Sequence, residues 1–370
     1  EDKLSDKLHE ELTKSFIDKR ASVLAKGLKQ DISFDTQIME NEKVMINKQF
    51  IGKLNGLKLE LDLKAGALET DIKSLKKAAR QNVGPEILSR IEQIKKTNLI
   101  ELKNDFKFYW QDFPIARLST GKDYLNPEIT LIVDEMIDEA DKLKFNKFLQ
   151  DWIDLKIKSD LKSLVDLRDI NTTNASIRAL AYQLYENNGV LKRESVSEYL
   201  KNLEQKERKI LRNLGVKFGR YHIFLFKLLK PEAVSLRILL WKNYHQKFYN
   251  LKPPTFGLNF LKNKNFKNKN FMLLCGFENF DKYFVRIDIL ERLFVQIINT
   301  NSDSKAKIKL VPEMLNLLGC SKDNFIKLIQ KMSYKPLKKI MNFISNMFQL
   351  NKKLKNLLKK IKKLIILLIY

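Results

Sequence analysis

The first feature of the sequence that could do chemistry is the run Asp138-Glu139-Ala140-Asp141. Carboxylates grouped in this way can hold Mg²⁺ and a water molecule against a nucleotide phosphate. That chemistry also needs a phosphate cradle: a glycine-rich loop, a following lysine for the β- and γ-phosphates, and a hydroxyl for the metal. No G-x-x-x-x-G-K-[ST] run occurs in the chain. The acids therefore have no phosphate site to act on.

The residues around this run favour a helix with its acids in solvent. Apolar residues recur at helical spacing from Ile129 to Leu143, whereas a nucleotide-binding acid should end a short buried strand. The preceding Asn126-Pro127-Glu128 combines a capping side chain, a proline suited to the first helical position and an acid facing the positive end of the dipole. We therefore expect one helix over residues 126–143.

Composition indicates a basic globular protein of two or three domains, with 370 residues of which 44% are hydrophobic. Two cysteines without a C-x-x-C spacing and three scattered histidines predict no metal site and reduced thiols. No apolar run approaches the ~20 residues of a membrane span, and the charged N-terminus is no secretory signal, so we expect a cytoplasmic protein. The net charge of +25 points to nucleic acid, although a merely solvated lysine-rich surface would give the same value.

Periodicity predicts a mainly α-helical fold with small β-hairpins (α+β). An amphipathic helix is expected over residues 4–28. Residues 44–54 and 108–118 then share one pattern: an apolar segment, a two-residue polar turn and a second segment ending in Ile, a small residue, a basic residue and Leu. Each copy reads as a β-hairpin followed by helices, which indicates an internal duplication.

Further along, composition predicts a strand in the glycine-punctuated residues 215–225, a helix opening at Pro231, a short strand over residues 271–274 and a helix over residues 287–298. Lys252-Pro253-Pro254 and the Asn/Lys tract after it predict a linker. The expected domains are a helix with duplicated hairpin units, a helical domain, a basic linker, a small α+β domain and a basic low-complexity tail, over residues 1–125, 126–250, 251–270, 271–336 and 337–370.

Residues 311–329 have the pattern of a helix-turn-helix: a helix, a glycine turn, Ser321 as N-cap and a second helix. On the second helix the polar residues that could meet a DNA groove are Lys322, Asp323, Lys327 and Lys331. An αα-corner that only packs a core has the same pattern. DNA binding and a purely structural role both remain open for this segment.

The chain also contains, in order, the stretches EDKLSDKLHEELTKSFIDKRASVL, LETDIKSLKKAAR, ALAYQLYENNGVL, LRNLGVKFGRYHIFLFKLLKP, CGFENFDKYFVRIDILERL and MLNLLGCSKDNFIKLI. Together these resemble the C-terminal half of the Suv3-like ATP-dependent RNA helicases of alphaproteobacteria, which are related to the mitochondrial RNA-degradosome helicase. The likeness covers roughly residues 1 to 335, and residues 215–223 carry its most specific part.

In that family two RecA-like motor domains precede the matching segment and hold ATP and Mg²⁺. The resemblance therefore implies a chain with no RecA-like motor, no catalytic, cofactor-binding or metal-binding residue of its own, and a motor supplied upstream in cis. The match ends near Pro336. For residues 337–370, a frameshifted reading frame and a basic amphipathic helix are both compatible with the amino-acid sequence.

The resemblance implies an accessory RNA-handling region that binds single-stranded RNA and works beside the motor domains and a ribonuclease. Basic and aromatic residues suit such contacts, and the candidates are Arg220, Tyr221 and His222 in the glycine-punctuated segment, and Lys262, Lys264, Phe266, Lys267 and Lys269 in the linker. For the linker residues the alternative is a solvated loop. For Tyr221 and His222 the alternative is a packed structural role. A helix-turn-helix DNA-binding protein that uses Lys322 and Lys327, or a docking module of a helicase–ribonuclease assembly, are the alternative functions.

Overall fold

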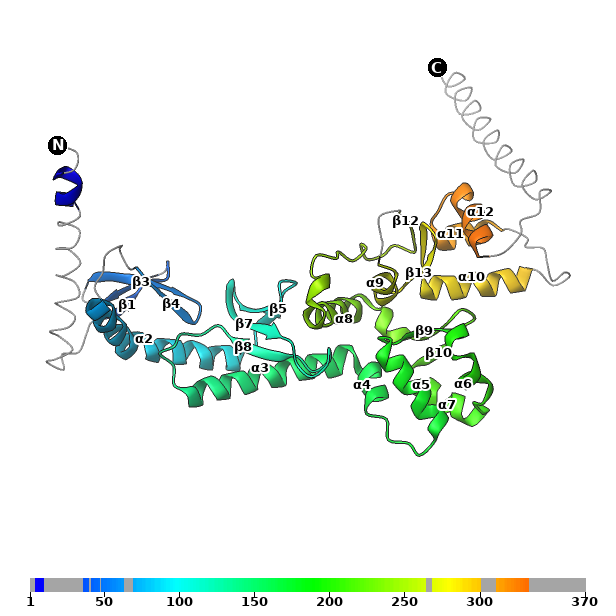
Figure 1. The fold of residues 1–370 in the computed structure, drawn as a ribbon, viewed down its shortest axis with the longest axis horizontal. Coiled ribbons are helices and arrows are strands. Elements are labelled where there is room, and N and C mark those ends of the chain that lie inside the picture. Colours follow the sequence, from blue (N-terminus) through cyan, green and yellow to red (C-terminus); the bar gives the residue numbers. More distant parts are fainter. Residues whose placement is uncertain are drawn as a thin grey trace, which may run out of the picture. The chain divides into compact units, whose positions relative to one another are not determined.

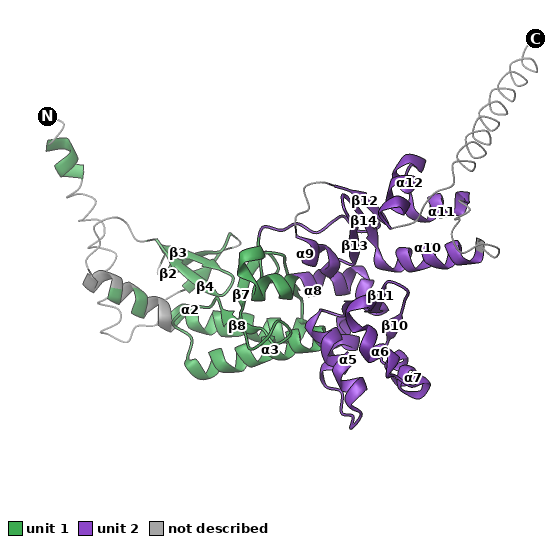
Figure 2. Ribbon diagram, turned by 45° about the vertical axis from the view of Figure 1, so that its right-hand side comes forward, with its two compact units in different colours: residues 1–157, 239–249 green, residues 158–238, 250–370 purple. Residues whose placement is uncertain are grey.

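The computed structural model describes residues 4–9, 36–39, 41–46, 48–62, 69–263, 268–300 and 311–332. The chain divides into two compact units, residues 1–157 with 239–249 and residues 158–238 with 250–370 (Figures 1 and 2). Of the helix expected over residues 4–28, residues 4–9 are helical and the remainder lies outside the described residues, as does the tail from residue 333 onward.

The first unit contains two four-stranded antiparallel sheets with the orders β1-β2-β3-β4 and β5-β6-β7-β8, each followed by a long helix (Figure 1). The elements are β1 (Thr36–Ile38), β2 (Lys43–Ile46), β3 (Gln49–Asn55), β4 (Lys58–Leu61), α2 (Glu69–Thr97), β5 (Ile100–Leu102), β6 (Lys107–Trp110), β7 (Phe113–Ser119), β8 (Glu128–Leu131) and α3 (Glu139–Asp160).

The two sheets repeat one backbone pattern. The hairpins β2–β3 and β6–β7 have the same register and a β-bulge at the same position. Before each hairpin one residue has a positive φ, 62° at Glu42 and 66° at Phe106. The carbonyl of that residue accepts the N–H of Leu54 in the first sheet (2.9 Å) and of Leu118 in the second (2.7 Å). The sequence pattern shared by residues 44–54 and 108–118 thus corresponds to one structural unit used twice.

Each long helix covers its own sheet with an apolar stripe. Arg90 of α2 donates to the Gly56 carbonyl (3.1 Å) and pairs with Glu42 at 2.8 Å, which ties the helix to the first sheet. In α3, Trp152 packs edge-on against Phe108 of the second sheet, with ring centroids 5.8 Å apart. The stripe of α3 is formed by the buried residues Phe145, Leu149, Ile153 and Ile157.

The single helix expected over residues 126–143 is wrong. Residues Glu128–Leu131 form β8, which pairs with β7, and α3 begins only at Glu139. Pairing with β7 satisfies the backbone of this segment, so sheet formation overrides the helical spacing of its apolar residues. Buried Asp134 then turns the chain, because its carboxylate accepts the N–H groups of Leu59 and Met136, both at 3.0 Å. The acidic run of residues 138–141 therefore lies at the start of α3, where carboxylates interact favourably with the positive end of the helix dipole.

The second unit contains two three-stranded antiparallel sheets, with the orders β10-β11-β9 and β12-β14-β13, surrounded by short helices. Its elements are α4 (Lys162–Arg168), α5 (Ala175–Glu186), β9 (Val190–Lys192), the 3₁₀ turn η1 (Arg193–Val196), α6 (Ser197–Lys201), α7 (Gln205–Asn213), β10 (Val216–Phe218), β11 (His222–Leu225), η2 (Phe226–Leu229), β12 (Phe260–Lys262), α9 (Lys269–Leu274), β13 (Phe277–Phe280), β14 (Tyr283–Arg286), α10 (Ile287–Thr300), α11 (Pro312–Leu318) and α12 (Lys322–Lys331). Helix α8 (Pro231–Tyr244) and the 3₁₀ turn η3 (Gln246–Phe248) lie between η2 and β12. Residues 239–249, which include the end of α8 and all of η3, belong to the first unit.

Two features join the sheets of the second unit. Buried Val190 and Phe224 of one sheet pack with Ile287, which follows the last strand of the other. Arg237 of α8 is fully buried and donates to the carbonyls of Asn188 (2.7 Å) and Leu274 (2.6 Å). These carbonyls lie just before β9 and at the end of α9, so one guanidinium holds both segments.

The predicted mainly α-helical fold is also wrong. Within the described residues the chain has four antiparallel sheets of three or four strands, so the fold is mixed α+β with helices and sheets in comparable roles. Most of the strands are three or four residues long, which is too short for an alternating pattern to stand out from loop sequence. The strand expected over residues 271–274 is part of α9, because the Asn268 side chain caps that helix by accepting the N–H of Phe271 at 2.9 Å. None of the helices in the described residues is long and apolar enough to cross a membrane.

Candidate nucleic-acid interface

The candidate residues of the predicted linker are only partly described. Lys264, Phe266 and Lys267 lie outside the described residues. Lys262 is exposed at the end of β12, and Lys269 is exposed at the first position of α9. The segment expected as a linker thus contains a paired strand and a helix start, and the structure places two of its five candidates on the surface.

The helix pair predicted over residues 311–329 is present as α11 and α12. Gly319 ends α11 in the left-handed conformation (φ 66°), and the Ser321 side chain caps α12. The apolar faces of both helices pack against α10 and β14 in one core cluster. Lys322 is half-buried and Lys327 exposed, so the pair forms a packed corner with lysines on its outer side.

Arg220, Tyr221 and His222 lie at the turn between β10 and β11, and Glu291 of α10 organises this turn. Its carboxylate accepts the backbone N–H groups of all three residues, at 2.9 Å for Tyr221 and 3.0 Å for His222. Gly219 allows this approach, because a Cβ there would lie about 2.4 Å from the Glu291 carboxylate. The glycine and the three residues after it therefore form one carboxylate-binding turn.

His222 is buried at the first position of β11, between two carboxylates. Its Nε2 lies 2.6 Å from Oε2 of Glu278 in β13, and its Nδ1 lies 3.8 Å from Oε1 of Glu291. Lys192 at the end of β9 donates to the other oxygen of Glu278 at 3.0 Å. The side chain of His222 is thus packed against these two carboxylates and is almost fully buried.

The ionisation of this cluster follows from its geometry. Burial disfavours the imidazolium of His222, but the hydrogen bond with Glu278 and the charge of Glu291 outweigh burial and raise the pKa of His222. Burial likewise disfavours both carboxylates. For Glu278 the hydrogen bond from His222 outweighs the effect of burial. For Glu291 the interaction with His222 and the three backbone N–H donors outweigh the effect of burial. The pKa values of both carboxyl groups are therefore lowered. The favoured state is an imidazolium between two carboxylates.

We expect the thermal stability of the chain to pass through a maximum between about pH 4.3 and pH 6.5, the ordinary pKa values of Glu and His. The raised pKa of His222 contributes stability below pH 6.5, and this is lost as pH rises through the folded-state value. The lowered pKa values of Glu278 and Glu291 contribute stability above pH 4.3, which is lost as pH falls. Melting temperatures measured from below pH 4.3 to well above pH 6.5 follow the loss of stability on the acid side and on the alkaline side. In a His222→Gln variant the alkaline limb should flatten, and an unchanged limb would contradict the assignment.

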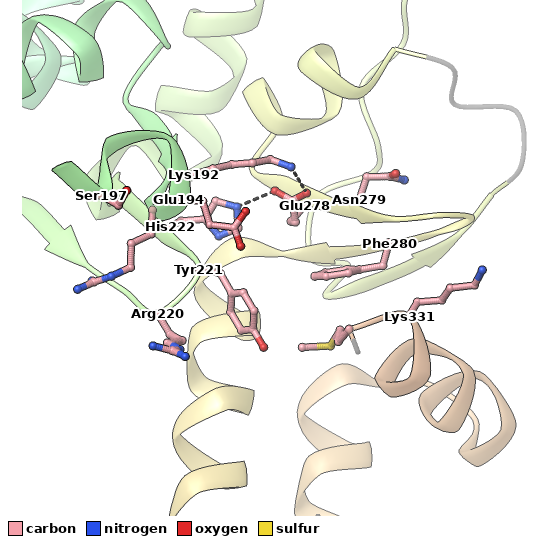
Figure 3. Close-up of a pocket in the computed structure, with 12 residues that line it drawn as sticks. Lys192, Glu194, Ser197, Arg220, Tyr221, His222, Glu278, Asn279, Phe280 and Lys331 are labelled. Atoms are coloured by element: carbon pink, nitrogen blue, oxygen red, sulfur yellow. Dashed lines mark hydrogen bonds and ion pairs between the residues drawn. The ribbon is translucent and has the colours of Figure 1, made fainter. Parts of the chain in front are cut away.

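A pocket of about 500 Å³ opens beside this cluster, within the second unit (Figure 3). Its wall combines the β9–η1 segment, the β10–β11 turn, β13 and the end of α12. Figure 3 shows Tyr221 and Phe280 projecting into the same space, with Lys331 near Phe280. Besides the His222 imidazolium, four basic side chains line the pocket against two carboxylates, so an anionic ligand is favoured: Lys192, Arg193, Arg220 and Lys331 against Glu194 and Glu278.

No family model, curated protein or solved structure matches the chain. The resemblance to the helicase family therefore stays a prediction from the sequence. Within the described parts of the chain, no three His, Cys, Asp or Glu side chains come together as metal ligands.

Among the residues that line the pocket, Lys192, Arg193 and Phe280 were not named from the sequence, and Lys331 was named only as a polar residue of the second helix that could meet a DNA groove. One signal could have pointed to two strands of the site. A lone glutamate in the apolar segment around Glu278 and a lone histidine in the apolar strand at His222 each need a buried partner. Lys192 and Arg193 gave no such signal, because a lysine or arginine at the end of an element is ordinary surface composition.

Proposed function

We propose that the chain is the C-terminal accessory RNA-handling region of an ATP-dependent RNA helicase and binds single-stranded RNA. The observation that carries the RNA-binding part is the pocket in the second unit, where cationic and aromatic side chains from four separate segments line one space. Single-stranded nucleic acids are bound by this combination, cations along the phosphates and aromatic faces under the bases. The sequence resemblance supports the helicase part, with ATP and Mg²⁺ held by motor domains upstream and with a ribonuclease as a further partner in the bacterial cytoplasm.

Affinity for single-stranded RNA should fall steeply with salt. If Arg193, Arg220 and Lys331 each neutralise one phosphate, the slope of log K against log[salt] is about −2, or roughly 20-fold weaker binding between about 50 and 200 mM salt. Fluorescence anisotropy with a labelled oligo(U) measures the slope, and a parallel assay should detect no ATP hydrolysis by the chain. Equal affinity at both salt concentrations would contradict phosphate contacts.

The same titrations separate the alternative functions. A helix-turn-helix DNA-binding protein should prefer particular duplex DNA sites and lose that preference on Lys322→Ala or Lys327→Ala. A docking module should bind neither RNA nor DNA. Because α11 and α12 bury their apolar faces in one core cluster, a supporting role for this pair agrees with the RNA proposal.

A further inference from the structure

The negative charge of Glu278, which lines the pocket, is compensated by neighbouring cations before any ligand binds. Glu278 accepts hydrogen bonds from His222 and Lys192, so its carboxylate meets two cations at 2.6 and 3.0 Å. Glu278 is also buried, with 9% of its side chain exposed. It therefore does not repel an anion at the mouth of the pocket, where Glu194 is the other carboxylate that lines the wall.

Three other basic side chains line the pocket: Arg193, Arg220 and Lys331. One guanidinium N–H of Arg193 donates to the Gly219 carbonyl at 2.8 Å, which positions that group. The Arg220 guanidinium lies over the ring of Phe294, 5.4 Å from its centroid. Lys331 pairs with Asp281 at 3.3 Å, but both side chains are more than half exposed, so this pair contributes little and a phosphate can compete for the ammonium.

The aromatic side chains give the pocket an apolar wall beside these cations. Tyr221 is held edge-on against Phe294, with ring centroids 5.6 Å apart. Phe280 is half-buried at the end of β13, opposite Tyr283 in the β13–β14 ladder. Both rings face the cavity in Figure 3. A ligand that suits this wall and the three basic side chains must carry a flat ring and a negative charge.

We propose that this pocket seats one unpaired nucleotide of an RNA strand, with its base against Phe280 and Tyr221 and with its own and the adjacent phosphates of the strand at Arg193, Arg220 and Lys331. A base within a duplex is stacked and paired and cannot enter a pocket, whereas an unpaired base can swing out onto aromatic side chains. A volume of about 500 Å³ lies in the range of small-ligand sites. This inference rests on the RNA binding proposed above and assigns it to one site.

The test compares a short labelled oligo(U) RNA with the same strand carrying abasic sites, both bound to the full chain. Phe280→Ala should weaken oligo(U) binding roughly 5- to 150-fold, as expected for one lost stacking contact, and should leave binding of the abasic strand unchanged. Phe280→Leu keeps an apolar side chain without the π face and should show most of the same loss. Lys331→Gln should weaken both strands, because it removes a phosphate contact. Thermal unfolding of each variant checks that the fold is retained.

The outcomes separate this inference from the proposed function. Salt-dependent RNA binding that is unaffected by Phe280→Ala and Lys331→Gln would overturn the pocket as the nucleotide site and leave RNA binding standing. Equal loss of both strands on Phe280→Ala would overturn base stacking there. If the unaltered chain binds no RNA at low salt, the proposed function fails, and the nucleotide site fails with it.

Discussion

Replacing Glu278 by alanine is expected to lower the free energy of unfolding by about 3–5 kcal/mol near pH 6, the cost of removing one partner from a buried ion pair. The change leaves the imidazolium of His222 buried without its 2.6 Å partner and releases Lys192. His222 can escape part of this cost by losing its proton. The loss should therefore be smaller at pH 8 than at pH 6. Urea unfolding followed by circular dichroism at both pH values measures it.

Three controls define this result. Glu278→Gln keeps the shape and one hydrogen bond and should cost less than Glu278→Ala. Glu186→Ala removes an exposed carboxylate and should stay within about 0.5 kcal/mol of the parent. In a His222→Gln background the effect of Glu278→Ala should shrink, because no buried imidazolium remains to be stranded. A loss below about 1 kcal/mol at pH 6 would show that the pair is not a buried ion pair in solution.

Arg237→Ala should destabilise the chain by a similar amount, about 3–5 kcal/mol. The substitution leaves the buried carbonyls of Asn188 and Leu274 without this donor, at about 1–3 kcal/mol each, and opens a cavity where a fully buried side chain stood. Because these carbonyls flank the segments leading to Lys192 and Glu278, RNA affinity should fall as well. Urea unfolding and RNA titration of the same preparations give both quantities.

Two replacements separate the causes of the Arg237 effect. Arg237→Met fills most of the volume but makes no hydrogen bond, so its difference from Arg237→Ala reports the cavity. Arg237→Lys keeps the charge, but a compact ammonium does not reproduce the fork of a guanidinium, and an intermediate loss is expected. Exposed Arg178→Ala is the matched control and should be nearly neutral. Parental stability of Arg237→Met would show that the two carbonyl bonds contribute nothing.

The features that could be predicted from the sequence depend on a few neighbouring residues. The turn at Gly319 and the cap at Ser321 are confirmed, as are the helix opening at Pro231 and the helix over residues 287–298. The glycine-punctuated residues 215–225 contain the predicted strand character as β10 and β11. Caps, positive-φ glycines and proline starts act over one turn of backbone, so their outcome is decided locally.

The strands and the site required the tertiary structure. Residues Glu128–Leu131 became a strand because β7 was available as a partner, and no pattern within four residues could announce that. Arg220, Tyr221 and His222 were predicted as nucleic-acid contacts, and they lie beside the pocket; Arg193, Phe280 and Lys331, which also line it, come from other segments of the chain. What the sequence determined by itself is a basic chain with well-marked helix ends and with strand character in the glycine-punctuated residues 215–225. Only the tertiary packing decided which carboxylates contact His222 and which rings and cations face one cavity. The reason is that the strength of an ion pair or a stacking site depends on burial by residues distant in the sequence.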